Sequence, residues 1–354
     1  MRAAKLRRSQ RNPVNQPYEI IGANPSPFSR KLRAILRYRR LPHVWRLRGP
    51  DMGPAIEAVR PRLIPILGIP ADDGSMRYAV DTTPLAHELE ARHPGARSIV
   101  PPDPAAAFLC HLIEDMADEW FMQAMYYFRW VEDDTGRFAA RWIIRERAGD
   151  VDAPTREMLE REVFTRQRGR MDIVCGGASN GAIIESHYRE LLRMLAPLAT
   201  QSRYLFGTRP SLADFALYGQ LSELVTDPLP QRIAREIAPS VELWVMQLDD
   251  ASGVEGEWVF NDEVATETRR SLLRLAARGY FPFMAANAAA VAASRETFEA
   301  EVDGHAYRRS AYGYQARCSR ELLAHWQALS ISDRGELEAL LGETGCLRYL
   351  NVAA

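Results

Sequence analysis

A short apolar run that gives way to an amphipathic helix is the feature that most constrains this chain. Residues 18–22 have the pattern of a strand, and Ser26-Pro27-Phe28-Ser29 follows shortly after them. Ser26 suits the N-cap position and Pro27 the first helical position, because serine accepts a free backbone N–H and proline brings none. The N–H groups of such a helix start favour a thiolate or another anion. The pattern predicts a strand-to-helix unit in which Ser26 either supports sulfur chemistry or only caps the helix.

The chain changes character along its length. Strand-like and helix-like segments alternate over residues 18–100, which predicts an α/β unit. A segment rich in proline and aspartate follows and predicts a linker, and a helical pattern dominates from there to about residue 250. Within that pattern Ser211 and Asp214 have the spacing of a capping box at a helix start.

The segments beyond the helical pattern predict a β-hairpin around Asp303-Gly304, because this dipeptide tolerates the positive φ that a two-residue turn requires. Two helices are expected after the hairpin. The predicted order is a basic, disordered tail at residues 1–17, an α/β domain at 18–100, an α-helical domain at 101–253 and a C-terminal extension at 254–354.

The charge balance and the cysteines argue against several classes of protein. Lys+Arg number 45 and Asp+Glu 46, for a net charge of -1, so nothing in the balance calls for nucleic acid or a charged membrane. No apolar stretch approaches the ~20 residues of a membrane span, and the N-terminus lacks the apolar core of a secretory signal, so we expect a cytoplasmic protein. The 4 cysteines lack the spacing of a zinc site or a disulfide framework, and no metal is expected.

The order of several short motifs resembles the glutathione S-transferase family over roughly residues 18–250. The motifs, in chain order, are Ser26-Pro27-Phe28-Ser29, Ile64-Pro65-Ile66-Leu67, Asp81-Thr82-Thr83-Pro84, Tyr204-Leu205-Phe206-Gly207 and Ser211-Leu212-Ala213-Asp214-Phe215. The resemblance implies an α/β thioredoxin-like domain, then an all-α domain, with the extension lying outside the family pattern. It also implies glutathione as co-substrate and a homodimer.

The resemblance gives roles to five residues. It implies a cis peptide at Pro65, which turns the backbone of Ile64 toward the cysteinyl part of glutathione. Asp81 and Thr82 match the pair that receives the γ-glutamyl end. Ser26 falls where the family places the residue that activates or attacks a thiol. Because serine cannot form a mixed disulfide, the preferred role of Ser26 is to stabilise the glutathione thiolate.

Further positions are candidates for the rest of the site. Trp120 and Tyr127 lie seven residues apart on one helical face, where they could wall a hollow that faces the first domain. The resemblance implies that an electrophile pocket lies there, although aromatic residues at this spacing also form cores. Asn24 is a second candidate donor to the thiol. The loop before Pro65 leaves open whether Arg60 or Arg62 would meet the glycyl carboxylate of glutathione.

The sequence therefore predicts a glutathione transferase that joins the glutathione thiolate to a hydrophobic small-molecule electrophile. A noncatalytic protein of the same fold that binds a ligand or partner is the alternative. A third hypothesis, a serine hydrolase, comes from the G-x-S-x-G pattern around Ser179, but its neighbouring segments read as helices where such a nucleophile needs a parallel sheet. The extension is expected to dock on the helical domain and the mouth of the cleft and to narrow access for the electrophile.

Overall fold

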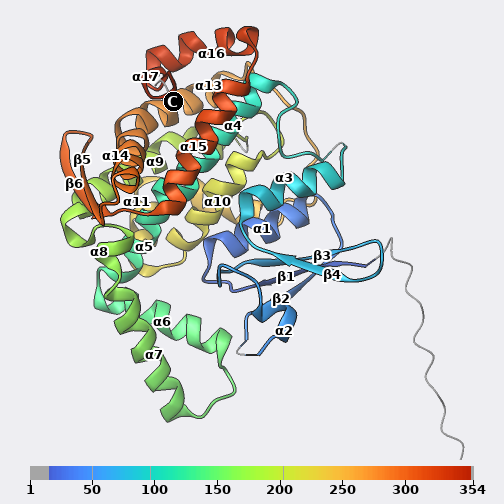
Figure 1. Cartoon of the computed structure of the whole chain (residues 1–354), viewed down its shortest axis with the longest axis vertical. Helices are drawn as coiled ribbons and strands as arrows, with labels where there is room; N and C mark the ends of the chain where they lie inside the picture. Colours follow the sequence, from blue (N-terminus) through green and yellow to red (C-terminus); the bar gives the residue numbers. More distant parts are fainter. Residues whose placement is uncertain (1–15, 50, 96, 202, 352–354) are drawn as a thin grey trace, which may run out of the picture.

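The computed structural model describes residues 16–49, 51–95, 97–201 and 203–351 (Figure 1). Most of the predicted tail, residues 1–15, lies outside the described residues. The fold class predicted from the sequence is confirmed, because a four-stranded mixed sheet with flanking helices precedes a largely helical part.

The N-terminal domain is built on the strand order β2-β1-β3-β4. Strand β1 runs parallel to β2 and antiparallel to β3, and β3 pairs antiparallel with β4, which is the thioredoxin-like arrangement. Helices α1 and α3 lie between the sheet and the helical domain (Figure 1). The elements are β1 (Tyr18–Gly22), α1 (Pro27–Tyr38), β2 (His43–Leu47), α2 (Pro54–Glu57), β3 (Ile66–Pro70), β4 (Met76–Ala79) and α3 (Thr82–Arg92).

The helical domain is organised around α10, all of whose residues are buried. The predicted capping box is present, because the Asp214 N–H donates to Ser211 Oγ at 3.4 Å and Asp214 Oδ2 accepts from the Ser211 N–H at 2.8 Å. Helix α1 crosses α10 at Gly219, where a Cβ atom would lie 2.9 Å from the Pro27 carbonyl oxygen. The elements are α4 (Pro104–Met116), the π-helix η2 (Ala117–Phe121), α5 (Met122–Trp130), α6 (Asp133–Arg147), α7 (Ala153–Arg168), α8 (Met171–Val174), the 3-10 turn η3 (Gly177–Asn180), α9 (Gly181–Thr200), α10 (Leu212–Leu224), α11 (Pro228–Ile237) and α12 (Pro239–Asp249).

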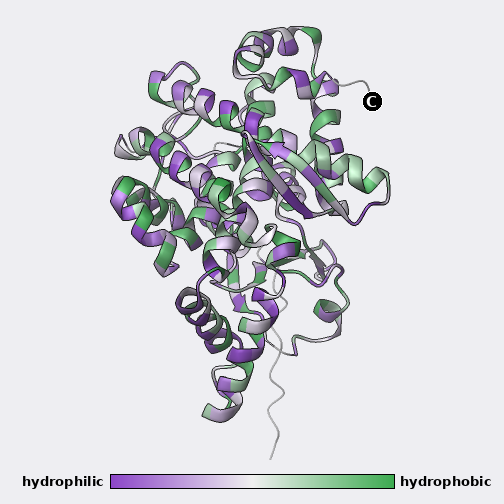
Figure 2. Ribbon diagram, turned by 90° about the vertical axis from the view of Figure 1, so that its left-hand side faces the viewer, coloured by the Kyte–Doolittle hydropathy of each residue, from purple (hydrophilic) through white to green (hydrophobic). Residues whose placement is uncertain are grey.

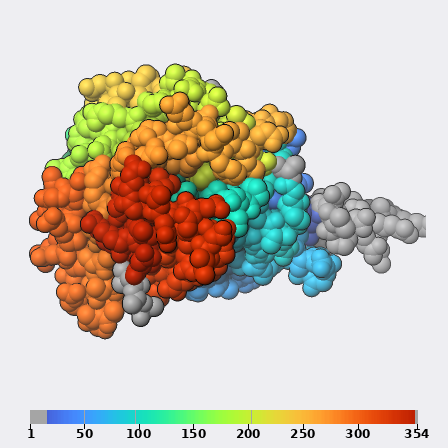
Figure 3. All heavy atoms as spheres, turned by 90° about the horizontal axis from the view of Figure 1, so that it is seen from above, coloured from blue at the N-terminus to red at the C-terminus, as the bar shows by residue number. Residues whose placement is uncertain are grey.

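The extension packs on the helical domain, as expected. Helix α13 lies against α9, and α15 and α16 both lie against α4. Figure 3 shows the red C-terminal segment seated between the orange α13–α14 segment and the teal region of α4. The hairpin turns at Asp303 and Gly304, with φ values of 50° and 76°. The elements are α13 (Glu263–Leu275), the π-helix η4 (Ala276–Tyr280), α14 (Phe281–Ala292), β5 (Thr297–Val302), β6 (His305–Ser310), α15 (Gly313–Ala328), α16 (Ile331–Thr344) and α17 (Leu347–Leu350).

One hydrophobic core runs through the sheet domain, the helical domain and the extension, since a single cluster of buried apolar side chains draws members from all three. Along the helices hydrophilic and hydrophobic residues alternate, as expected for helices that bury one face (Figure 2). Among the described residues, no helix combines the length and the apolar character needed to span a bilayer. The extension is therefore integrated into the fold rather than tethered to it.

Candidate functional site

The strand register brings the three sequence motifs of the N-terminal domain to one edge of the sheet. Ile21 pairs with Ile66, so the chain that leaves β1 toward Ser26 lies beside Pro65, which immediately precedes β3. Leu67 pairs with Ala79, so the chain that leaves β4 toward Asp81 reaches the same edge. Motifs that lie far apart in the sequence thus share one sheet edge, because β3 runs antiparallel to both β1 and β4.

Ser26 caps α1, as the sequence predicts, and it also heads a short chain of hydroxyl groups. Its Oγ accepts the Ser29 N–H at 3.3 Å and the Ser29 hydroxyl at 3.0 Å, and Ser29 Oγ accepts the Ala23 N–H at 3.4 Å. The residue is 9% exposed. A serine hydroxyl both donates and accepts, so the contact between the two hydroxyl groups can use the proton of either one. When Ser29 donates to Ser26, the Ser26 hydroxyl can donate to a ligand, and the chain of donors polarises it.

Ser29 is a site residue that the sequence did not single out. Gly22 leaves room for it, because a Cβ atom at Gly22 would lie 2.7 Å from Ser29 Oγ. The repeated serine in Ser26-Pro27-Phe28-Ser29 was the one signal that could have found it. Its position one helical turn after the cap puts both hydroxyl groups on the same side of the helix start.

A buried arginine of the helical domain fixes the residue before Ser26. Arg129 Nη1 donates to the Pro25 carbonyl oxygen at 3.0 Å, while Nε donates to Asp227 at 2.7 Å and Nη2 to Glu223 at 2.5 Å. Arg129 is 3% exposed and both carboxylates are fully buried. Domain packing and the position of the Ser26 loop therefore depend on the same guanidinium group.

Asn24, the second candidate donor, is held by other residues. Its backbone N–H and its side-chain amide both donate to Glu146 of α6 at 2.9 Å, and its Oδ1 accepts from Arg33 at 2.8 Å. These contacts use the amide group that would otherwise face a thiol. The hydroxyl groups of Ser26 and Ser29 are consequently the candidate donors left at this helix start.

The peptide bond between Ile64 and Pro65 is cis, as the resemblance implied, and the bond between Arg60 and Pro61 is cis as well. Arg60 Nη1 donates to the carbonyl oxygens of Glu57 and Val59 in its own loop. Arg62 is exposed as well, and both arginines stay candidates for the glycyl carboxylate.

Asp81 begins α3 in an unusual backbone conformation and meets the extension. Its φ is 85°, which a residue with a side chain adopts at a cost, and its carboxylate does not cap its own helix. Instead the carboxylate accepts the Tyr314 hydroxyl at 3.0 Å and Arg317 Nη2 at 2.6 Å, both from α15. Thr82 beside it is buried. The end of the sheet that was predicted to hold the γ-glutamyl group therefore borders the extension.

The two predicted pocket residues lie in different surroundings. Trp120 is 3% exposed, donates from Nε1 to His187 Nδ1 at 3.1 Å, and packs on Phe283 and Tyr307 of the extension. Tyr127 is partly buried, and burial raises the pKa of its hydroxyl. Trp120 thus contributes to the contact between the helical domain and the hairpin, while Tyr127 keeps a partly accessible ring.

Buried acids lie where the extension covers η2. The side-chain oxygens of Asp115 and Glu119 and the sulfur of Cys318 lie within 4.8 Å of one another, and this is the group among the described residues that is close enough to hold a metal ion. Tyr280 donates to Asp115, and burial raises the pKa of Asp115 to about 6. Burial and the charge of Asp115 raise the pKa of Glu119 to about 8.

These shifts predict that the free energy of unfolding falls as the pH rises from about 5 to about 8. In that range folded Glu119 keeps a proton that a glutamate in the unfolded chain, with an ordinary pKa of 4.5, has lost. Asp115 acts in the same direction at lower pH. We expect Glu119→Gln, which stays neutral, to flatten the decline of the urea midpoint between about pH 5.5 and about pH 8.5. A decline as steep as that of the unmodified chain would contradict the assigned protonation.

Ser179, the basis of the hydrolase hypothesis, lies in the turn η3 between helices α8 and α9. Its hydroxyl donates to the Gly176 carbonyl oxygen at 2.8 Å. A nucleophile elbow follows a strand of a parallel sheet, whereas a helix precedes this serine. The hypothesis is therefore wrong in its structural premise.

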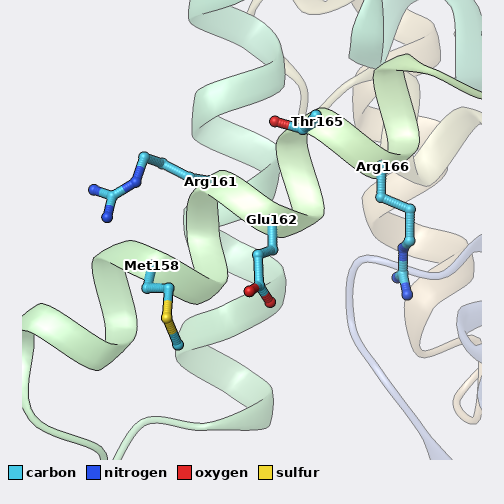
Figure 4. Close-up of a pocket in the computed structure, with 5 residues that line it drawn as sticks. All are labelled: Met158, Arg161, Glu162, Thr165 and Arg166. Carbon is cyan, nitrogen blue, oxygen red and sulfur yellow. The ribbon is translucent and has the colours of Figure 1, made fainter.

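A surface hollow on α7 lies apart from all of these residues (Figure 4). One face of that single helix provides the whole lining, so the hollow contains none of the predicted site residues. Its residues are Met158, Arg161, Glu162, Thr165 and Arg166. The sheet edge, rather than this hollow, collects the chemically informative side chains.

Comparisons with known proteins agree with the thioredoxin-like fold of the sheet domain. Residues 20–97 match the family model described as "Glutathione S-transferase, N-terminal domain". A comparison with curated proteins gave no match.

Among solved structures, a Methylobacterium radiotolerans glutathione S-transferase in complex with glutathione sulfonate is similar at 22% identity and TM-score 0.42, over 70% of this chain and 99% of that one. A Rhodospirillum rubrum glutathione S-transferase has 18% identity and TM-score 0.40, over 72% of this chain and 91% of that one. Because these identities and TM-scores are low, the fold assignment rests on the strand order and the family match. The N-terminal domain of this chain resembles that of the glutathione S-transferases.

Proposed function

We propose that this chain, whose residues 20–97 resemble the glutathione S-transferase N-terminal domain, binds glutathione at the shared sheet edge and activates its thiol. The observation that carries the proposal is the Ser26 hydroxyl, which caps α1 and whose other side-chain partner, the Ser29 hydroxyl, can donate to it and leave its proton for a ligand. Pro65 and Asp81 lie at the same edge, where the cysteinyl and γ-glutamyl parts of glutathione would bind.

The chemistry follows from the acidity of a thiol. A free cysteine thiol has a pKa near ~8.5, so only a few per cent is ionised at neutral pH. A hydrogen bond to a charged partner contributes about 1.5–3 kcal/mol, which lowers a pKa by about one to two units. The N–H groups of the α1 start favour the anion further. A bound thiol would then be largely ionised at neutral pH.

The proposed reaction is attack of the thiolate on a hydrophobic electrophile. The thiol proton leaves to solvent, a lone pair of the sulfur forms the C–S bond, and in a substitution the leaving group departs with the electrons of its own bond. Trp120 and Tyr127 remain the proposed pocket residues for the electrophile. The homodimer and the cytoplasmic location also stay predictions.

A noncatalytic binding protein is the second candidate, and one observation favours it. The Asp81 carboxylate already accepts two hydrogen bonds from α15 of the extension. In a chain with only the sheet domain and the helical domain, this carboxylate would have no such partners. Retention on immobilised glutathione together with turnover of a generic aryl halide supports the transferase. Retention without turnover over a panel of electrophiles supports the binding protein.

Replacing Ser26 by Ala tests the proposal directly. We expect turnover of the aryl halide at neutral pH to fall about 10- to 100-fold, because the thiolate loses its donor, while glutathione affinity changes little. Rates measured across a pH series should show the profile displaced to higher pH by about one to two units.

Ser330→Ala is the matched control, since Ser330 caps α16 in the same way through the Asp333 N–H, at 3.1 Å, far along the chain from the site. Both variants should lose about 1 kcal/mol of stability through the lost cap. Equal turnover in the two variants would mean that Ser26 acts only as a helix cap.

A further inference from the structure

Two residues of α15 contact the carboxylate that was predicted to bind the γ-glutamyl end of glutathione. Tyr314 and Arg317 each donate to one oxygen of Asp81, at 3.0 Å and 2.6 Å. The Arg317 guanidinium also lies over the Tyr314 ring, 4.6 Å from its centroid. Nothing in the family resemblance covers α15, so these contacts belong to the extension of this chain.

The Arg317 side chain has donor capacity left. Its Nε faces Glu321 at 3.3 Å and its Nη2 faces Asp81, while Nη1 finds no acceptor among the described residues. The side chain is 45% exposed and that of Asp81 19%, so a ligand can reach the pair. The guanidinium fork suits a carboxylate, which it can bind through two parallel N–H groups.

Helix α15 is held in place by its other face. Leu322 and Trp326 are each 2% exposed, Cys318 is buried, and Trp326 packs on Phe108 of α4 with ring centroids 5.2 Å apart. This apolar contact fixes the helix independently of the surface pair. Arg317 can therefore exchange one partner for another without displacing α15.

We propose that α15 completes the glutathione site, with Arg317 binding the α-carboxylate of the γ-glutamyl group and Asp81 binding its α-ammonium. The inference rests on the proposed function and adds the extension to that site. The γ-glutamyl end carries one positive and one negative charge, and the Asp81–Arg317 pair presents the complement of both. Binding replaces one ion pair by two without leaving an unpaired charge. The Tyr314 hydroxyl keeps its contact with Asp81 and orients the carboxylate.

The test compares glutathione with two analogues by titration calorimetry. In one, 4-aminobutyryl replaces γ-glutamyl, which removes the α-carboxylate. In the other, glutaryl replaces it, which removes the α-ammonium. We expect Arg317→Gln to weaken glutathione and the glutaryl analogue about tenfold or more. The 4-aminobutyryl analogue should not be weakened, because its ammonium binds Asp81 and no longer competes with Arg317. Asp81→Asn should show the converse selectivity between the two analogues.

Arg320→Gln is the matched control, because Arg320 is an exposed arginine on the same helix, and its affinities should equal those of the unmodified chain. If the unmodified protein and Arg317→Gln bind glutathione equally well, the inference is overturned, while the proposed function stands. Tighter binding of glutathione by Arg317→Gln also overturns the inference, and it shows that the Asp81–Arg317 ion pair blocks the site. Failure of the unmodified chain to bind glutathione overturns the proposed function and the inference together.

Discussion

Replacing Arg129 by Met should lower the free energy of unfolding by about 3–5 kcal/mol, because it leaves two buried carboxylates without their partner. Arg129 donates to Glu223 and Asp227 and to the Pro25 carbonyl oxygen, and its side chain is 4% exposed. Because Pro25 immediately precedes Ser26, turnover should fall as well. Urea unfolding gives the stability, and aryl halide turnover of the folded variant gives the effect on the site.

Arg168→Met serves as the control for Arg129. Arg168 pairs with Asp133 at the surface, where its side chain is 40% exposed, and such pairs contribute about 0–1 kcal/mol. A loss for Arg129→Met as small as that for Arg168→Met would show that the buried network is not what joins the α5 helix to the Ser26 loop.

Replacing Lys31 by Met should cost a similar amount, about 3–5 kcal/mol, at the contact between α1 and α4. Lys31 Nζ lies 2.7 Å from Glu114 and 2.5 Å from Asp118, and its side chain is fully buried. Glu114 also accepts the Thr83 hydroxyl, so the loss should extend to the start of α3. Urea unfolding of the variant measures the cost.

A second substitution separates charge from packing at this contact. Adding Asp118→Asn to Lys31→Met removes one of the stranded carboxylates, and we expect it to recover part of the lost stability. Asp118→Asn alone gives the reference cost in free energy of unfolding. If the double variant is less stable than Lys31→Met by that same cost, Lys31 and Asp118 are not coupled, and their ion pair does not join the domains.

Local signals were sufficient to predict the sheet domain and its helix starts. Ser26 and Pro27 form the α1 cap as expected, and Asp303-Gly304 makes the hairpin turn. The motif Ile64-Pro65-Ile66-Leu67 does not itself mark where β3 starts, and the strand begins at Ile66, because Pro65 has no N–H to contribute to the ladder. Such boundaries depend on pairing with β1, which a single strand does not reveal.

Helix α6 lies within the region where the sequence predicts helices, but its own bounds were not predicted. Gly136 lies in its first turns, where glycine disfavours a helix, yet a Cβ there would lie 2.8 Å from the Phe164 ring of α7. The helix is stabilised by its partner rather than by its own residues. The long helical run over residues 104–130, by contrast, agrees with the helical pattern, since α4, η2 and α5 follow one another without a break.

Site residues could be predicted where they belong to a short sequence motif, and they could not be predicted where only the fold brings them to the site. Ser26, Pro65 and Asp81 could be selected because they belong to short motifs with fixed neighbours. Arg317 lies 236 positions after Asp81, in a segment with no motif, and only the docking of α15 brings the two together. Arg129 is hidden for the same reason, since its partners come from α10 and the residue that caps α11.

The pKa of the glutathione thiol bound to this protein tests the central claim most directly. It is measured from the ultraviolet absorbance of the thiolate during a pH titration of the saturated complex, in the unmodified chain and in Ser26→Ala. The account predicts a pKa about one to two units below the ~8.5 of a free thiol in the unmodified chain, and a return toward that value in Ser26→Ala. A pKa that is already unshifted in the unmodified chain, or one that stays low without the Ser26 hydroxyl, would contradict it.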